Sequence, residues 1–406
     1  MELHSGSPYW IVRNGLLADL PTLKEDLPNE DIVIIGSGIS GALVAHELSV
    51  RGVRCTMIDS RMLSSGSTWA STAQLNYELD TSLVQLSEWY GESMAAAVYH
   101  SSLESVDKLH QVLIATNTHA SYHKRSSLYL ASDKKAEKSL RKESELRHKN
   151  GIPCDLVEEP QLRDNYKSDY RLALHHNHAA ELDSYRAAAG IIRYHSLGNG
   201  LKVFTHTRIT KMQSGKDGVR LLTDSGHTIH AKKVVCAAGY EAASFLPKTV
   251  ARLESTFALV TAPVSEELLW NEKSLIWETA RPYFYLRTTP ENRIMAGGED
   301  IIFKNALLRD NLMAEKTEKL LKRCRTLLPW IEDLQLDFSW CGTFAETDDG
   351  LPYIGGYPGL DHVYFALGYG GNGTTFSMQG AEIIANSLFG TADARAALYG
   401  FDRKRH

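Results

Sequence analysis

The chain has 406 residues, 43% of them hydrophobic and 23% charged, which is an ordinary globular composition with room for two or three domains. The formal net charge is -5, from 44 Lys and Arg against 49 Asp and Glu. This balance supplies no basic field, so we expect binding neither to nucleic acid nor to an anionic membrane. We interpret the basic run at 403–406 as a solvated tail.

The five cysteines are scattered, and no two have the spacing of metal ligands. A sparse, odd set of this kind suits a reducing compartment. Residues 1–14 lack the basic and apolar regions of a signal peptide, and no apolar run approaches the roughly 20 residues that cross a bilayer. We therefore expect a cytoplasmic protein with no membrane span and no metal.

The clearest local structure lies in residues 31–59. The β-branched run at 31–35 (DIVII) is typical of a buried parallel strand. The turn GSGISG at 36–41 follows it, and then come a helix predicted over 42–51 and a second strand at 54–59. This succession predicts one compact βαβ unit.

Helices and strands alternate from there to residue 239. Apolar residues recur every three or four positions over 81–117, which predicts helical structure. Asp183 is suited to cap the N-terminus of a helix that runs to Leu197. A charged surface helix is predicted over 134–149, and strands are predicted at 128–131, 202–205, 219–223 and 234–239.

Beyond Phe257 the pattern is that of an antiparallel sheet, with a hairpin tip at 290–292. A helix over about 311–328 ends before Pro329. The last segment, 339–389, is rich in glycine and closes on a helix from about Thr374. The strands predicted for this sheet span 256–262, 274–278, 282–288 and 293–298.

The glycine turn predicts a dinucleotide site, because a buried strand precedes it and a helix follows. Gly36 permits the tight turn, Gly38 lets the backbone approach a pyrophosphate, and Gly41 lets the helix pack closely on the strand. The helix N-terminus favours an anion. Asp59 lies 18 residues beyond Gly41, where a carboxylate can accept hydrogen bonds from ribose hydroxyls.

The choice between FAD and NAD rests on the number of such turns. A chain that binds both usually carries two, and only one is present. Small hydroxyl side chains at 66–68 follow Asp59 where a pyrophosphate or flavin can lie, and 234–239 is similar to the second nucleotide-side strand of flavoproteins. These features favour FAD, with a structural glycine turn as the alternative.

Six segments together resemble the D-amino-acid-oxidase-type flavoprotein family, which includes glycine oxidase, sarcosine oxidase and related amine dehydrogenases. The similarity covers most of the chain. The first segment is generic to two-dinucleotide-fold flavoproteins, whereas the last two, in that order, are more specific. They are DIVIIGSGISG at 31–41, GSTWAST at 66–72, AELDSYR at 180–186, VVCAAG at 234–239, TDDGLPYIG at 347–355 and GYGGNG at 368–373.

The resemblance implies an α/β fold in which a Rossmann-like FAD domain with a mixed parallel sheet is interleaved with an α+β substrate domain. The antiparallel sheet of the substrate domain is then expected to cover one face of the flavin. We place the FAD-binding domain at 28–105, 183–250 and 338–406, the substrate domain at 106–182 and 251–337, and an N-terminal extension at 1–27.

The resemblance also implies the cofactor contacts. The N-terminus of the last helix is expected to meet the pyrimidine edge of the flavin, where it stabilises the negative charge of the reduced ring. Ile209 is expected to contact the adenine through its backbone. The full expected FAD set is Gly36, Gly38, Ile39, Ser40, Gly41, Asp59, Ser60, Arg61, Ser67, Thr68, Ala70, Ser71, Ile209, Ala238, Gly239, Gly371, Asn372, Gly373, Thr374 and Thr375.

The implied chemistry is hydride transfer from the carbon next to an amine nitrogen onto flavin N5, which leaves an imine that water hydrolyses. This chemistry needs no nucleophile and no metal. The histidines at 175, 176 and 178 lack a partner acid at ligand spacing, and we interpret them as solvated.

Alternation along 281–287 places Arg281, Tyr283, Tyr285 and Arg287 on one face of a strand. Such a face suits a ligand pocket or an exposed sheet surface. Because family members place this strand above the flavin, we take Tyr283, Tyr285 and Arg287 as the candidate substrate-facing residues. Trp69 and Tyr353 are candidates by analogy, with core packing as the alternative.

Two family features are absent at the aligned positions. The arginine and the lysine that hold a substrate α-carboxylate in glycine-oxidase-like and sarcosine-oxidase-like members align with Phe344 and Thr375. The cysteine that tethers flavin in sarcosine oxidases aligns with Gly342, one residue beyond Cys341. We therefore expect noncovalent FAD and a substrate without a simple α-carboxylate, unless an arginine of strand 281–287 holds a more distant acid.

The resulting function is an FAD-dependent oxidoreductase that acts on a C–N bond of an amine or N-substituted amino acid. Oxygen, a quinone or a carrier is expected to reoxidise the flavin. Two alternatives stay open: a flavin enzyme that modifies a tRNA base, which the acidic balance disfavours, and a flavoprotein without catalysis.

Overall fold

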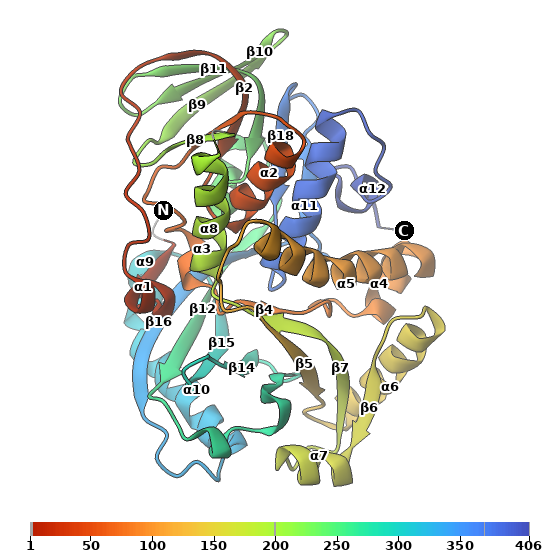
Figure 1. Ribbon diagram of the computed structural model, residues 1–406. Coiled ribbons are helices and arrows are strands. Elements are labelled where there is room, and N and C mark those ends of the chain that lie inside the picture. Colours follow the sequence, from red (N-terminus) through yellow and green to blue (C-terminus); the bar gives the residue numbers. More distant parts are fainter. Residues whose placement is uncertain (1–2, 199, 369, 406) are drawn as a thin grey trace.

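Two large sheets organise the chain in the computed structural model, which describes residues 3–198, 200–368 and 370–405. In Figure 1 the smaller sheet and its helices form the upper half of the molecule, and the larger sheet forms the lower half. Strands from widely separated parts of the sequence meet in both sheets. The mixed α/β fold confirms the expected fold class.

The upper sheet has a parallel centre. Strands β18, β11, β2, β3 and β8 pair in parallel, β17 adds antiparallel to β18, and the β9–β10 hairpin extends from β11. Its strands are β2 (Leu27–Ile35), β3 (Cys55–Ile58), β8 (Leu201–Phe204), β9 (Ile209–Gly215), β10 (Gly218–Thr223), β11 (Thr228–Cys236), β17 (Tyr353–Gly356) and β18 (Val363–Leu367).

The lower sheet is antiparallel except where β5 runs parallel to β13. Its order is β1-β16-β12-β15-β14-β13-β5-β7-β4, with β6 paired to β7. The strands are β1 (His4–Gly6), β4 (Gln74–Leu75), β5 (His123–Leu130), β6 (Asp155–Glu158), β7 (Leu172–Glu181), β12 (Arg252–Thr261), β13 (Leu275–Glu278), β14 (Phe284–Thr288), β15 (Ile294–Ile302) and β16 (Leu336–Glu346).

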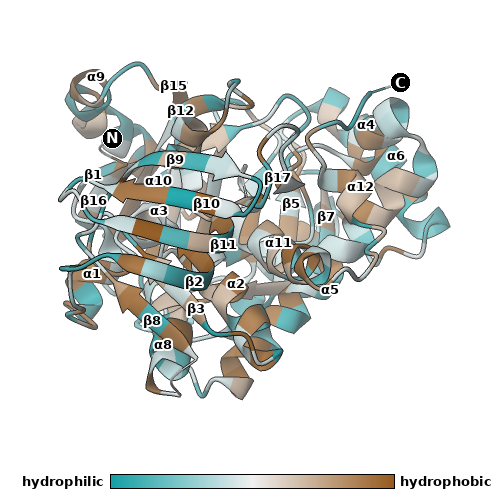
Figure 2. Ribbon diagram, turned by 90° about the horizontal axis from the view of Figure 1, so that it is seen from above, coloured by the Kyte–Doolittle hydropathy of each residue, from teal (hydrophilic) through white to brown (hydrophobic). Residues whose placement is uncertain are grey.

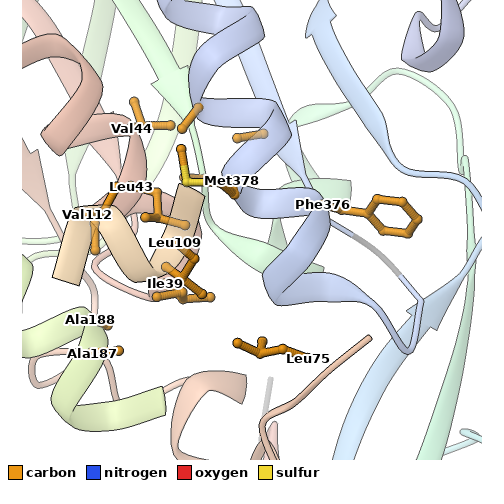
Figure 3. Packing of buried hydrophobic residues seen from close by; sticks show 14 of the residues in the cluster. Ile39, Leu43, Val44, Leu75, Leu109, Val112, Ala187, Ala188, Phe376 and Met378 are labelled. Carbon is orange, nitrogen blue, oxygen red and sulfur yellow. The ribbon is translucent and has the colours of Figure 1, made fainter. Parts of the chain in front are cut away.

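Four helices form the layer next to the parallel sheet: α2 (Ile39–Val50), α5 (Glu92–Ala115), α8 (Ser184–Leu197) and α11 (Gly373–Leu388). Helix α2 is buried on most sides because α8 and α11 both pack against it. Figure 3 shows Met378 of α11 beside Leu43 and Val44 of α2. The strands they cover are apolar too, as the brown segments of β2 and β11 in Figure 2 show.

The remaining helices lie around this frame. They are α1 (Tyr9–Asn14), α3 (Ser67–Ala70), α4 (Leu83–Tyr90), α6 (Lys134–Lys149), α7 (Glu159–Tyr166), α9 (Ala306–Asn311), α10 (Met313–Leu327) and α12 (Ala396–Tyr399), with short 3-10 turns at 239–245, 266–268 and 271–273. Within the described ranges, no helix has the length and apolar character required to cross a membrane.

Several predicted elements agree closely with the structure. Helix α6 has the predicted bounds, and Asp183 caps α8 by accepting a hydrogen bond from the Arg186 N–H at 2.9 Å. The helical structure predicted over 81–117 is confirmed as two helices, α4 and α5, which Gly91 separates with a φ of +83°. Strand β9 was not predicted, because its exposed polar positions hide the apolar alternation.

The first described residues attach to the lower sheet. Strand β1 pairs with β16, the ring of His4 lies 3.0 Å from the Ser65 carbonyl oxygen, and Arg13 forms an ion pair with Asp183. The expected domain boundary at 338 falls inside β16, whose other residues also belong to the lower sheet. The two-domain division with its stated bounds therefore stays a proposal.

Candidate active site

A cavity of about 330 Å³ lies where the carboxyl ends of the parallel strands meet the lower sheet. Ligands of open α/β sheets bind at this edge. The cavity has two chemically different ends. Residues at one end follow β2, β3 and β11, and residues at the other come from the aromatic strands β13 and β14 and from the segment after β4.

The glycine turn is shaped by backbone contacts that exclude a side chain. A Cβ on Gly36, whose φ is +109°, would lie 2.4 Å from the carbonyl oxygen of Ala237, and a Cβ on Gly41 would lie 2.0 Å from the carbonyl oxygen of Gly36. Gly38 caps α2 and would meet the Thr68 hydroxyl at 3.0 Å. The tight turn inferred at Gly36 and the close helix packing inferred at Gly41 are thus visible in the geometry, and the approach of a pyrophosphate to Gly38 stays a prediction.

Asp59 stands at the end of β3 and holds the glycine turn. Its carboxylate accepts hydrogen bonds from the N–H and the hydroxyl of Ser37, both at 2.7 Å, and from the Arg61 N–H at 2.8 Å. Burial raises the pKa of Asp59, and these hydrogen bonds act in the opposite direction. Arg61 forms a two-pronged ion pair with Glu241, a residue beyond β11 that also lines the cavity.

Most of the residues expected to bind FAD line this one cavity. These are Gly36, Gly38, Ile39, Ser40, Asp59, Ser60, Arg61, Ser67, Thr68, Ser71, Ile209, Ala238, Gly239, Gly371, Asn372, Gly373 and Thr374. Gly41, Ala70 and Thr375 are not in its wall, and Thr375 instead donates a hydrogen bond to the Asn76 carbonyl oxygen. The Ser67 hydroxyl is a buried donor with no partner in the protein.

The C-terminal glycine loop meets the middle of the cavity. A Cβ on Gly368 would lie 2.7 Å from the Gly373 carbonyl oxygen, so the loop folds tightly as α11 begins. The Asn372 side chain donates to the carbonyl oxygens of Asn76 and Glu78, at 3.1 and 2.9 Å. The N-terminus of α11, with its positive dipole end, therefore lies beside the segment that follows β4.

An aromatic wall closes the other end of the cavity. Trp277, Tyr283 and Tyr285 line it, and Tyr129 stacks on Trp277 with ring centroids 3.6 Å apart. The Tyr285 ring lies across Gly297, because a Cβ there would be 2.3 Å from its hydroxyl oxygen. Burial raises the pKa of Tyr285 to about 12 and that of Tyr283 further, so both are neutral donors at pH 7.

Arg287 does not reach this wall. It lies beyond the cavity, 1% exposed, with Nη1 3.3 Å from a Glu181 carboxylate oxygen and Nη2 donating to the Leu182 carbonyl oxygen at 3.0 Å. We therefore no longer assign Arg287 to the substrate, since its donors serve a buried ion pair. Trp69 packs on Tyr185, and Tyr353 stacks on Phe401, both as core contacts.

Several cavity residues were missed in the sequence, and three of them alternate along one segment. Asn76, Glu78 and Asp80 all line the cavity, whereas Tyr77 and Leu79 between them are buried in the core. The alternation of polar and apolar residues over 76–80 was the sequence signal that could have found them. It was overlooked because the segment is short and follows a strand of only two residues.

Glu78 belongs to a buried charged network. Its carboxylate accepts hydrogen bonds from Arg147 and from the Ser127 hydroxyl at 2.8 Å, and His176 Nε2 lies at 3.1 Å. Burial raises the pKa of Glu78, but His176 and Arg147 more than offset this and lower it to about 2. The expectation of a solvated His176 is therefore wrong: it is 2% exposed, whereas His178 is exposed.

Comparison with known proteins decides the family. The family model described as "FAD dependent oxidoreductase", DAO, matches residues 31–387. The chain belongs to this family of FAD-dependent oxidoreductases. The recognition from six sequence segments is thereby confirmed.

Full-length relatives are distant. The chain is 21% identical to the probable oxidoreductase OrdL of Haemophilus influenzae, over 98% of this chain and 90% of that protein. It is 23% identical to the gamma-glutamylputrescine oxidoreductase of Escherichia coli, over 97% and 91%. The crystal structure of glycine oxidase from Geobacillus kaustophilus is similar with a TM-score of 0.77 and 19% identity, covering 92% of this chain and 99% of that one.

The residues fit FAD. Gly36 and Gly38 line the cavity without side chains at the N-terminus of α2, the Ser67 hydroxyl supplies an unpaired donor, and Asp59 supplies an acceptor after β3. Cys341 does not line the cavity; its Sγ lies 3.6 Å from a carboxylate oxygen of Asp310. Within the described ranges, no group of three or more His, Cys, Asp or Glu side chains is placed to hold a metal ion.

Denatured protein is expected to release intact FAD, and Asp59→Ala to weaken FAD binding by about 1–3 kcal/mol because ribose hydroxyls lose an acceptor. Fluorescence of released flavin against added FAD measures this. Asp59→Asn removes the charge but keeps the size of the side chain and one acceptor oxygen, so this variant should retain part of the affinity for FAD. A protein mass raised by one FAD after denaturation, or recovery of FMN, would contradict this expectation.

Proposed function

We propose that this protein oxidises a C–N bond of an amine or N-substituted amino acid. When bound, FAD supplies the hydride acceptor at its N5, and the oxidised substrate is an imine that water hydrolyses. The observation that carries the proposal is the aromatic wall of Trp277, Tyr283 and Tyr285, which shares one cavity with the dinucleotide site. The names of relatives that act on glycine and on gamma-glutamylputrescine support an amine-type substrate.

The protein groups at this end bind and orient, since none of them is a nucleophile of the acyl-transfer kind. The neutral hydroxyls of Tyr283 and Tyr285 can donate hydrogen bonds to a substrate, and the ring faces exclude water from the reacting carbon. The N-terminus of α11 is suited to stabilise negative charge on the reduced ring system.

The lining argues against a simple amino acid as substrate. Among the described residues, no Lys, Arg or His lines the end formed by β13, β14 and the segment after β4. Arg287 is already paired with Glu181. An α-carboxylate buried without a cation costs several kcal/mol, which is enough to abolish useful affinity.

The proposed function is tested by anaerobic reduction of the flavin, which is measured as the loss of its visible absorbance. Primary and secondary amines are expected to bleach the flavin, and glycine, sarcosine, D-alanine and D-proline to do so only at concentrations at least about a hundredfold higher, which corresponds to roughly 3 kcal/mol. Fast bleaching by the small amino acids would contradict the substrate assignment. If no amine bleaches the flavin, the function itself is wrong.

Two further proposals concern context. The acceptor that reoxidises the flavin is oxygen, a quinone or a carrier, and five free, buried cysteines support a reducing, cytoplasmic location. Modification of a tRNA base is the second candidate function, and salt-dependent tRNA binding would favour it. Bleaching by dithionite alone would favour a flavoprotein without catalysis.

A further inference from the structure

The charges along the cavity are divided unevenly. At the dinucleotide end, Arg61 and Arg208 line the wall together with Asp59 and Glu241. At the aromatic end, the charged lining residues within the described ranges are both acids, Glu78 and Asp80.

Glu78 does not act alone. It shares Arg147 with Glu143, so two buried carboxylates surround one guanidinium. Burial lowers the pKa of His176, and the neighbouring Glu78 carboxylate acts in the opposite direction.

Asp80 is the more accessible acid. Its side chain is exposed to the cavity, and one carboxylate oxygen accepts a hydrogen bond from the Gly371 N–H at 3.2 Å. Arg281, which precedes β14, is an exposed cation near this end. Its Cζ lies 4.8 Å from the Tyr283 ring centroid, and its guanidinium donates to the Ala280 carbonyl oxygen. It does not line the cavity, although its charge stabilises the Asp80 carboxylate and opposes the rise that burial causes in the pKa of Asp80. Asp80 therefore presents a carboxylate beside aromatic rings.

One unpaired acceptor in the cavity wall points to a ligand that donates a hydrogen bond. Asn76 lines the same cavity and is 9% exposed, yet its Oδ1 has no hydrogen-bond partner in the protein. Asp300 on β15 also has a buried Oδ1 without a partner, but this residue lies outside the cavity wall. Burial, together with the Asp80 charge, raises the pKa of Asp300 to about 6. Among the described residues, the wall at this end offers hydrogen-bond acceptors and no cationic side chain, which suits a cationic N–H ligand.

Aromatic faces with a carboxylate are the surroundings that favour an ammonium ion. The ring centroids of Trp277 and Tyr283 are 6.4 Å apart, and those of Tyr283 and Tyr285 are 5.7 Å apart. A cation is attracted to such faces, more strongly where water is excluded. We propose that the substrate carries a second, non-reacting ammonium group, which Asp80 and the rings of Trp277 and Tyr283 hold. This inference rests on the proposed amine oxidation and names its substrate class.

The first test compares α,ω-diamines, from propane to octane, with the n-alkylamines and ω-amino acids of matching length, by anaerobic bleaching of the holoenzyme. The best diamine is expected to half-reduce the flavin at a concentration on the order of tenfold lower than its monoamine, and the ω-amino acid to be poorest. Asp80→Asn should narrow the diamine-to-monoamine ratio, whereas Asp107→Asn, an exposed acid on α5, should leave it unchanged. Equal affinities, or a preference for the ω-amino acid, would overturn the proposal.

The second test needs no turnover. Tetramethylammonium, which cannot form an imine, should perturb the flavin absorption spectrum of the holoenzyme at concentrations on the order of tenfold below those of its neutral analogue tert-butanol, and acetate should not perturb it. A perturbation by acetate, or none by the cation, overturns the inference. Cation binding without bleaching by any amine would instead refute the proposed oxidation and keep the cation site. Because this comparison of the three compounds uses the wild-type holoenzyme, it tests the cation site even if the Asp80→Asn variant fails to bind FAD.

Discussion

Replacing Arg147 by methionine is expected to lower the free energy of unfolding by about 3–5 kcal/mol. The guanidinium is 1% exposed, donates to Glu143 at 2.9 Å and to Glu78, and lies over the rings of Tyr77 and Tyr99. Methionine fills similar space but leaves both carboxylates without a cation. Chemical denaturation, followed by circular dichroism, measures the change.

The same helix offers a matched control. Arg141 on α6 pairs with Glu158 at 2.8 Å, but both side chains are about half exposed. Arg141→Met should therefore cost about 0–1 kcal/mol. Similar losses for the two variants would show that the buried network contributes no more than a surface pair.

Gly41→Val is expected to abolish FAD binding and to destabilise the fold by about 3 kcal/mol or more. The new Cβ would lie 2.0 Å from the Gly36 carbonyl oxygen, so α2 must move away from β2 and the glycine turn must open. Because the obstacle is backbone, a side-chain rotation cannot relieve it. Flavin content after purification, together with the denaturation midpoint, measures both effects.

Gly356→Ala serves as the control for that substitution. It lies at the end of β17 in the upper sheet, and its Cβ would meet only the Val363 carbonyl oxygen at 3.9 Å, an ordinary contact. This variant should keep its FAD and change the stability by less than about 1 kcal/mol. Normal FAD content in Gly41→Val would refute the close packing of α2 on β2.

The dinucleotide end was predictable because its determinants are local. Gly36, Gly38 and Gly41 act within one turn, and Asp59 ends the next strand of the same βαβ unit. Their positions follow from short-range spacing, and the structure places Gly36, Gly38 and Asp59 in the wall of one cavity. The period of two also predicted that Tyr283 and Tyr285 share one face of the chain at β14, and both line the cavity.

Partners from distant segments were not predictable. Arg287 follows the same alternation as Tyr285, but β7 supplies Glu181, and the ion pair removes the arginine from the site. His176 was predicted to be solvated because its partner, Glu78, lies about a hundred residues earlier in the sequence and only the fold brings the two together. In both cases the sequence specifies the residue type, whereas the sheet order β5-β7-β4 determines its neighbour.

The pairing of β1 with β16 has a consequence for how the protein acquires its flavin. During synthesis, residues 4–6 leave the ribosome long before their partner strand, 336–346. The cavity wall likewise runs from Leu3 to Ser377. A nascent fragment that lacks α11 therefore lacks part of the cavity wall, so we expect the chain to capture its flavin only after α11 has left the ribosome.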